Sequence, residues 1–328
     1  MKKVLFFTDF SKLHEALSYF NMDGFADKKI PVKLHMGEMK NPYYSPPDFV
    51  KLVIDELKHI RAEPYLFDTT VAYPGLRSTK TGYKKLAQMH GFSKKTIGCD
   101  IVISDSGVPI TVENRVFDVA SQIMDATHIV AISHCKGHIQ VGFGGAIKNF
   151  GMGGVTRETK KRMHRGSRPV YTKDACTYCG VCAELCPFDA IKVTHNKWRY
   201  SNHACFGCGV CVDVCKNKAL TYTDANLQYL IVLAAKACLE AKNVLYINEL
   251  KRIAKSCDCD PFPGPTIVPD IGYLIAADPV AIDKASLDLI NDVKENIFQK
   301  VNGIDPYKQI KYGEEIGLGS SSYQLIEL

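Results

Sequence analysis

Residues 128–135, HIVAISHC, form a short apolar run that ends in polar side chains, and a glycine-rich segment follows it up to residue 154. A run of this length indicates a buried strand. Comparable runs occur elsewhere in the chain: VLFFTD, VKLHMGE, PYLFDTT, DIVISDSG, VLYINEL and DIGYLIAA. Helical patterns separate most of them, near 11–20, 47–60, 80–91, 225–241 and from about 279. Strands that alternate with helices predict an α/β fold with a parallel sheet that is covered on both faces.

Two cysteine runs interrupt this alternation. CTYCGVCAELCP at 176–187 recurs as CFGCGVCVDVC at 205–215, and this shift of 29 residues, from 176 to 205, indicates an internal duplication. Each run has the spacing C-x2-C-x2-C-x3-C, which is typical of 4Fe–4S ligation. The alternative is a pair of structural zinc ions, but zinc sites normally use two C-x2-C pairs that a longer loop separates.

These runs are similar to those of bacterial-type two-cluster ferredoxins, and the resemblance covers residues 171–224. In that family the fourth cysteine of each run binds the cluster of the other run. The resemblance therefore assigns two sets of ligands, one for each 4Fe–4S cluster: Cys176, Cys179, Cys182 and Cys215, and Cys205, Cys208, Cys211 and Cys186. It implies low-potential transfer of single electrons and an electron-transfer protein as a partner. One departure is Lys216, where the family usually has proline.

We thus expect a parallel-sheet α/β domain built from 1–170 and 225–328, with a ferredoxin-like (α+β) domain inserted at 171–224. Thirteen cysteines in a chain of 328 residues indicate metal binding or catalysis rather than a disulfide framework. The N-terminal apolar run is too short for a signal peptide, and no segment reaches the length of a membrane span. We expect a cytoplasmic protein without a membrane partner.

The formal net charge of +6 overstates the basic character of the chain if both clusters are present. Four thiolates and an oxidised core give each cluster a charge of about −2, which lowers the total to about +2. We therefore expect no nucleic-acid partner. One basic run remains, RETKKRMHRGSR at 157–168. It is either a solvated helix or linker, or a docking face for an acidic redox protein or an anionic ligand.

Polar residues follow the expected strands, at the edge where open parallel sheets bind their ligands. They are Glu38, Lys40, Asp68, Thr69, Thr70, Asp105, Ser106, Ser133, His134, Asn248 and Glu249. Residues of these types also cap helices, so each one taken alone is as compatible with capping as with ligand contact. Their convergence at one edge favours a ligand site.

The segment 133–154 contains six glycines from 142 to 154 together with Lys148. Glycines let a backbone approach a ligand closely, and their amides can bind an anion. We predict cofactor contacts at Gly142, Gly144, Gly145, Lys148 and Asn149, with an anionic small molecule as the substrate. The three histidines around this loop add capacity for proton transfer or metal binding: His134, His138 and His164. Tight turns between elements are the alternative use of such glycines.

Two further resemblances concern this region. The whole chain resembles an uncharacterised family of iron–sulfur proteins in which a two-cluster ferredoxin unit interrupts a domain of unknown function; GFGGAIKNFGMGG and PDIGYLIAADPVAID carry this resemblance. Residues 128–164 are similar to the cofactor segment of nickel-pincer lactate racemases. There the equivalent of Lys148 anchors a nucleotide-derived cofactor covalently, that of His164 binds nickel and that of His138 is an acid/base. The acidic residue-x-Thr-Arg-Pro motif of that family is missing, and Ile147 replaces its arginine.

The remaining cysteines have no shared pattern. CDCD at 257–260 offers soft and hard ligands for a further metal, or a redox-active thiol, while buried or capping roles are equally compatible with it. Cys99 and Cys238 are expected as small core residues. Cys135 lies between His134 and Lys136, which would lower its pKa if it faced a pocket.

The leading hypothesis is an oxidoreductase that passes single electrons between two 4Fe–4S clusters and a small-molecule or cofactor site in the α/β domain, with His138, Lys148 and His164 as its catalytic residues. One alternative is a ferredoxin-like carrier or redox sensor without catalysis of its own. Another is a nickel-pincer-like isomerase whose clusters are structural.

Overall fold

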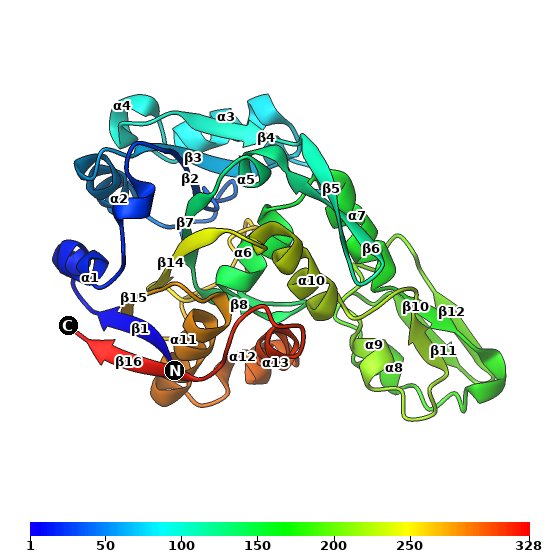
Figure 1. Cartoon of the computed structure of the whole chain (residues 1–328). Coiled ribbons are helices and arrows are strands. Elements are labelled where there is room, and N and C mark those ends of the chain that lie inside the picture. Colours follow the sequence, from blue (N-terminus) through cyan, green and yellow to red (C-terminus); the bar gives the residue numbers. More distant parts are fainter.

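The computed structural model describes residues 1–328 and has a mixed α/β architecture (Figure 1). Eight strands form its central sheet, in the order β16-β1-β15-β14-β7-β2-β3-β4. Their bounds are β1 Lys2–Phe7, β2 Lys29–Lys33, β3 Glu63–Thr69, β4 Ile101–Ser104, β7 His128–His134, β14 Asn243–Leu250, β15 Gly272–Ala276 and β16 Tyr323–Glu327. Each strand expected from the apolar runs is present, and β16 is an additional edge strand.

The sheet is mostly parallel, which corrects the expectation of a purely parallel one. Strand β15 runs antiparallel to both of its neighbours, β1 and β14, while all other pairs are parallel. A parallel pair needs a crossover, usually through a helix. The segment between β14 and β15 contains no helix. The chain therefore returns beside β14 in the opposite direction.

Helices cover both faces of the sheet. The side chains of each strand alternate between the two faces, and each face has its own hydrophobic cluster. Along β7, Ile129 and Ala131 belong to one cluster and Val130 and Ile132 to the other. The first cluster includes α6 Ala146–Gly153, α10 Leu227–Leu239, α11 Pro279–Val293, α12 Ile297–Asn302 and α13 Lys308–Glu315. The second includes α1 Leu13–Ser18, α2 Pro47–His59, α3 Lys80–Met89 and α4 Lys94–Ile97.

Some elements have no counterpart in the predicted pattern. The largest is the hairpin of β5 Gly107–Val112 and β6 Arg115–Ala120, whose turn residues Glu113 and Asn114 have φ of 47° and 61°. Two positive φ values match the twist of a tight hairpin. The turn contains no glycine, the residue that usually indicates such a hairpin in a sequence. The others are short: α5 Ser121–Met124, β8 Lys136–His138, β9 Gly142–Gly144, η1 Phe10–Lys12, η2 Asp23–Phe25, η3 Leu76–Ser78 and η4 Lys173–Ala175. The basic run forms α7 Arg157–Gly166.

Residues 169–222 form a small unit beside the sheet, here called the cysteine-rich unit (Figure 1). Its elements are β10 Pro169–Tyr171, α8 Val181–Glu184, β11 Ile191–Thr194, β12 Lys197–Tyr200, α9 Val210–Asp213 and β13 Leu220–Tyr222. Strand β10 pairs with β13, and β11 with β12. Each pair thus joins the first half of the unit to the second.

The duplication in the sequence is also a duplication of the backbone. Three pairs of positions 29 residues apart share a positive φ, namely Tyr178 and Gly207, Gly180 and Gly209, and Asp189 and Lys218. The short helices α8 and α9 follow the second pair in the same way. The two cysteine runs therefore adopt the same local conformation.

None of the helices combines the length and the apolar character that a membrane span requires.

Candidate functional site

A cavity of about 830 Å³ lies at the carboxyl edge of the sheet and extends to the cysteine-rich unit. Its wall includes Asp68 from β3, Ser133 from β7 and His35 just after β2, as the rule for open sheets predicts. On the opposite side the wall includes Phe188, Cys205 and Phe206 from the cysteine-rich unit. One cavity thus joins both parts of the chain.

Most polar residues expected at the strand ends do not line this cavity. Thr70 donates a hydrogen bond to Asp105, and Asp105 in turn accepts the backbone N–H of Arg157 at the start of α7, at 2.9 Å. Asn248 donates to Asp283 at 2.9 Å. These residues serve capping and support. Asp68, Ser133 and His134 are the expected strand-end residues that reach the cavity.

The glycine-rich segment supplies part of the cavity wall. Gly144, Gly145, Lys148 and Asn149 line the cavity, but Gly142 does not. Gly142 has φ +74°, and a Cβ there would lie 2.8 Å from the carbonyl oxygen of Ile304. Gly142 therefore has a packing role here, and its predicted ligand contact stays a prediction.

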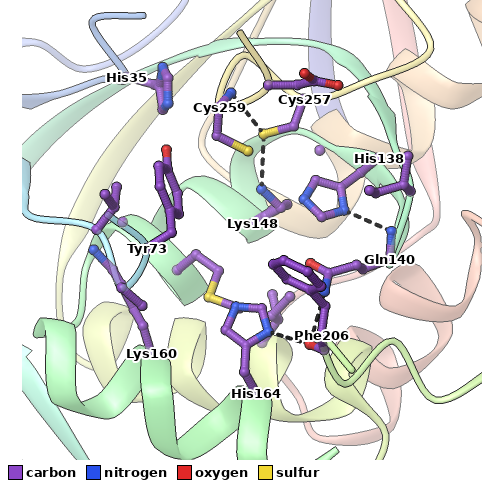
Figure 2. A pocket seen from close by; sticks show the side chains of 18 of the residues that line it. His35, Tyr73, His138, Gln140, Lys148, Lys160, His164, Phe206, Cys257 and Cys259 are labelled. Atoms are coloured by element: carbon purple, nitrogen blue, oxygen red, sulfur yellow. Dashed lines mark hydrogen bonds between the residues drawn. The ribbon is translucent and has the colours of Figure 1, made fainter. Parts of the chain in front are cut away.

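Asn149 also has a supporting role. Its amide donates to the carbonyl oxygen of Ile132 at 3.0 Å and to Ser133 Oγ at 3.1 Å, and its Oδ1 accepts from Lys33 Nζ at 2.8 Å. These bonds fix α6 against the ends of β7 and β2. Lys148, one residue earlier on α6, is free to point into the cavity (Figure 2).

Lys148, His138 and Cys257 meet in the cavity wall (Figure 2). Lys148 Nζ lies 3.6 Å from Cys257 Sγ. The ligand atoms of His138, Cys257 and Cys259 all lie within 4.8 Å of one another. The CDCD loop thus contributes both of its thiols to the site. This position agrees with two of the roles considered for the loop, a metal site or a redox-active thiol.

The other residues of the CDCD loop are used for support. His134 is in contact with Asp258 through Nδ1 at 2.8 Å and with the carbonyl oxygen of Lys251 through Nε2 at 2.7 Å. Lys136 Nζ lies 2.8 Å from the same carboxylate. Both ring nitrogens of His134 are therefore engaged in contacts within the chain.

The isolated cysteines are buried in the core. Cys99 and Cys238 belong to the two hydrophobic clusters, as expected. Cys135 is also buried in a cluster and does not line the cavity. Burial raises the pKa of the Cys135 thiol well above its ordinary value. Cys135 does not face the cavity, so the lowered pKa that such a position would give is not expected.

The basic run has one face in the cavity, so it is more than a solvated helix. Lys160, Lys161, His164 and Arg165 of α7 line the wall. Lys160 Nζ donates to Thr69 Oγ1 at 2.6 Å. Burial lowers the pKa of Lys160 to about 7 and that of His164 to about 4. Lys160 can therefore exchange a proton near neutral pH.

A buried ion network forms the floor of the cavity, and of its members only Asp68 was predicted from the sequence. Lys33 Nζ lies 2.9 Å from Asp68, and Arg77 Nη2 lies 3.4 Å from the same carboxylate. Burial opposes the ionisation of Asp68, yet these two cations hold its pKa below its ordinary value. A lysine inside the apolar strand β2 was the available signal for Lys33. Arg77, Tyr73 and His35 carried no comparable signal.

The loop around Cys205 is docked against the α/β part of the chain. The carbonyl oxygen of Phe206 accepts from Gln140 Nε2 at 3.0 Å and from His164 Nδ1 at 3.2 Å. Arg168 donates to the carbonyl oxygen of Cys205 at 3.1 Å. These bonds hold one end of the cysteine-rich unit in the cavity wall.

The cysteines of the two runs influence each other's ionisation. Burial raises the pKa of Cys182, and the charges of Cys179, Cys215 and Cys176 add to this shift. Burial likewise raises the pKa of Cys208 to about 11, with added effects from Cys186 and Cys205. In both cases a cysteine of the other run contributes.

No three sulfurs of the eight clustered cysteines lie within 4.8 Å of one another, because His138, Cys257 and Cys259 are the one group of three such ligands at this spacing within the described chain. In a tetrahedral zinc site with Zn–S bonds of about 2.3 Å, the sulfurs lie about 3.8 Å apart.

A family model described as "Domain of unknown function (DUF362)" matches residues 30–288. A search of curated proteins finds no match. Among solved structures, the lactate racemase apoprotein from Thermoanaerobacterium thermosaccharolyticum is similar at 13% identity and a TM-score of 0.41, over 76% of this chain and 50% of that one. A Thermotoga maritima protein from a structural genomics consortium is similar at 12% identity and a TM-score of 0.44, over 90% and 59%. The chain thus spans between half and three fifths of these structures.

Proposed function

We propose that this chain, which belongs to the DUF362 family, is an iron–sulfur oxidoreductase that exchanges single electrons with an anionic small molecule. The observation that supports this proposal best is the cavity of about 830 Å³. Cys205, at one end of its wall, belongs to a cysteine set that fits a 4Fe–4S cluster. Lys148 and Cys257 lie in the same wall, on the α/β side.

The cysteine-rich unit fits two 4Fe–4S clusters by its chemistry. Its cysteines form two runs of four with the C-x2-C-x2-C-x3-C spacing that is typical of 4Fe–4S ligation. Backbone N–H groups point at three sulfurs: Tyr178 at Cys176 at 3.4 Å, Ala190 at Cys186 at 3.3 Å and Gly207 at Cys205 at 3.3 Å. Such bonds tune cluster potentials. Bound clusters would supply reversible transfer of single electrons.

The charge of the cavity favours an anion. Eight cationic side chains line it: Lys33, Arg77, Lys136, Lys148, Lys160, Lys161, Arg165 and Arg168. The carboxylates in the lining are Asp68 and Asp260. Asp68 is already paired with Lys33 and Arg77. A bound carboxylate, phosphate or similar group would therefore meet an excess of positive charge.

Protons for a reduction would come from the cavity wall. Burial lowers the pKa of His138 below its ordinary value, and Lys148 adds to this effect, so the ring is neutral near pH 7. Lys160, whose pKa is about 7, is a second group that can donate or accept a proton. Both line the cavity, on opposite sides of it in Figure 2.

The test combines metal analysis with ligand binding on anaerobically purified protein. We expect about eight irons per chain, as two 4Fe–4S clusters require. Anionic metabolites would be screened for an increase in melting temperature and for oxidation of the reduced clusters. Lys148→Met should remove the ligand response and keep the iron, whereas Lys197→Met, at an exposed position of β12, should change neither. Full iron content without a response to any anion would instead indicate an electron carrier or redox sensor.

A second candidate is a nickel-pincer-like isomerase, and the common location of His138, Lys148 and His164 favours it. All three line the same cavity (Figure 2). After burial, the charges of His138 and Lys148 contribute to the lowered pKa of His164, so the three groups are neighbours. This candidate requires a mass adduct on Lys148 and bound nickel, together with activity that persists after Cys205→Ser. An unmodified Lys148 in a nickel-free protein contradicts it.

A further inference from the structure

We propose that Cys257 and Cys259 form a redox-active dithiol that reduces an anionic disulfide bound in the cavity. This inference rests on the function proposed above and specifies its substrate class. Both cysteines line the cavity, and both sulfurs point into it (Figure 2). No other pair of cysteines on the α/β side of the wall is available for such a reaction, because Cys99, Cys135 and Cys238 are buried in the core.

The loop geometry holds the two thiols together. The N–H of Asp260 donates to the carbonyl oxygen of Cys257 at 2.9 Å, which closes a turn around both cysteines. Their sulfurs lie within 4.8 Å of each other, and the N–H of Cys259 points at Cys257 Sγ at 3.4 Å. Asn41 fixes the turn by donating to the carbonyl oxygen of Asp260 at 2.7 Å. Small rotations of the side chains can therefore bring the sulfurs to bonding distance.

The orientation of His138 favours a dithiol over a metal site. Its Nδ1 faces the backbone N–H of Gln140 at 3.1 Å and so acts as an acceptor. The proton of the neutral ring is then on Nε2. A histidine that binds a metal presents an unprotonated nitrogen and donates its other N–H to an acceptor. His138 has the reverse arrangement, in which the ring can donate a hydrogen bond to the Cys257 thiolate.

Hydrogen bonds and charges around the pair shift the pKa values of the two thiols in opposite directions. The hydrogen bond from Cys259 holds the pKa of Cys257 well below its ordinary value, although burial opposes this, and Lys148 and His138 contribute. The pKa of Cys259 is raised well above its ordinary value by the same hydrogen bond and by burial. Lys136 and His35 also face Cys257, and Asp258 opposes them but is paired with His134 and Lys136. Cys257 is thus the thiolate nucleophile and Cys259 the resolving thiol.

The proposed reaction is a thiol–disulfide exchange in two steps. The Cys257 thiolate attacks one sulfur of the substrate disulfide, the substrate S–S bond breaks and one thiolate leaves. Cys259 then loses its proton and attacks Cys257 Sγ, which releases the second half of the substrate and forms the Cys257–Cys259 disulfide. The products are one thiolate and one thiol, so the substrate gains two electrons. Two electrons, one from each of the two proposed clusters, and one proton restore the Cys257 thiolate and the Cys259 thiol.

The test uses two disulfides of similar length but opposite charge, dithiodipropionate and cystamine, on the anaerobic full-length protein. In Cys259→Ser we expect one stable mixed disulfide on Cys257, measured by peptide mass. The wild-type protein should instead lose two alkylatable thiols at 257 and 259 without an adduct, and Cys257→Ser should not react at this loop. Cys135→Ser is the control and should behave as wild type. If serine disturbs the turn, Cys259→Ala should trap the same species.

The rates test the charge of the site. Dithiodipropionate should react at least about tenfold faster than cystamine. A tenfold ratio of rates corresponds to an electrostatic free energy equal to a shift of about one pKa unit. Lys148→Met should reduce this preference and slow alkylation of Cys257 by iodoacetamide at pH 6. Equal rates for the two probes would overturn an anionic substrate.

Separate outcomes distinguish this inference from the proposed function. Absence of the mixed disulfide in Cys259→Ser and Cys259→Ala, in protein with its full iron content, would overturn the dithiol and leave the proposed function standing. A stoichiometric metal that is lost in Cys257→Ser would also overturn it. A disulfide that forms with the anionic probe but is not restored to thiols in dithionite-reduced protein would support the exchange site and contradict electron supply from the clusters.

Discussion

The α/β part of the chain buries hydrophobic clusters of 44 and 29 residues, whereas the cysteine-rich unit buries a cluster of three, Ile191, Cys211 and Leu220. A unit as small as residues 169–222 rarely obtains enough stability from such a core, and metal binding is a usual substitute. The α/β part has no such need. The comparison supports the proposed clusters, because apolar burial is large in one region and small in the other.

Both regions contain buried polar atoms without a hydrogen-bond partner. In the α/β part they include Asn248 Oδ1 and Glu249 Oε2, and in the cysteine-rich unit Trp198 Nε1 and Tyr200 Oη. Trp198 and Tyr200 differ from the others because they lie beside cysteines of the two runs, Cys182 and Cys205. The sulfur atoms of the proposed clusters would be acceptors for these two donors.

Removing the proposed iron should have the broadest effect on this comparison, because it acts on the whole of the cysteine-rich unit. We would treat the protein with an iron chelator under anaerobic conditions. The protection factors of amide exchange in residues 169–222 should then fall about hundredfold or more, which corresponds to about 2.7 kcal/mol in the free energy of local opening. Strands β7 and β14 should keep theirs, because apolar packing does not depend on the metal. Hydrogen exchange read by mass spectrometry measures both regions at once. Unchanged protection of 169–222 would show that the unit is stable without metal.

Phe150→Ala should affect the opposite region. Phe150 is fully buried in α6 and packs edge-on against Tyr246 at 6.0 Å between ring centroids. Deleting its ring should destabilise the α/β part by about 3–5 kcal/mol, because the site cannot collapse around the cavity. Iron content should not change. Chemical denaturation and iron analysis provide the measurements, and Met89→Ala, on the exposed face of α3, is a control expected within about 0.5 kcal/mol.

Lys160→Met should have the smallest effect, on anion binding in the cavity between the two regions. Since the pKa of Lys160 is about 7, the wild-type protein should bind sulfate up to about tenfold more tightly at pH 6 than at pH 8. The variant should lose this difference, which titration calorimetry can measure. Lys161→Met, next on α7, is the matched control and should weaken binding equally at both pH values. A pH dependence that survives in Lys160→Met would assign the titration to another group.

The same shift has a consequence for folding. Lysine has a pKa of 10.5 in the reference state, so between pH 7 and pH 10.5 the unfolded chain carries a proton at residue 160 that the native chain lacks. Stability therefore rises with pH through this window as far as Lys160 contributes. Below pH 7 the buried ammonium reduces stability, and Lys160→Met should remove this penalty.

Much of the α/β fold could be predicted because it rests on local periodicity. The runs that became β1, β2, β3, β4, β7, β14 and β15 are apolar and short, and the helices between them have an apolar stripe. The direction of β15 and the hairpin β5–β6 could not be predicted in this way. One depends on the path of a loop without a helix, and the other on a turn of Glu113 and Asn114 that carries no glycine.

Residues of the candidate site could be predicted where several reactive residue types lie close in sequence. The structure brings His138, Lys148 and His164 to one cavity, and their catalytic roles stay predictions. The contacts of Gly142 and His134 with the distant segments around Ile304 and Asp258 could not be predicted. Residue type alone does not show which distant segment packs against a side chain.

The sequence by itself determined the alternation of strands and helices, the duplication of the cysteine runs and the chemistry available to each residue, because all three are written in local spacing. Only the tertiary structure decided that Cys205, Lys148 and Cys257 line one cavity. It also decided that Lys160 of a basic helix is buried beside Thr69 rather than solvated. Burial and distance between segments remote in the chain set these pKa values and contacts, and no local pattern contains them.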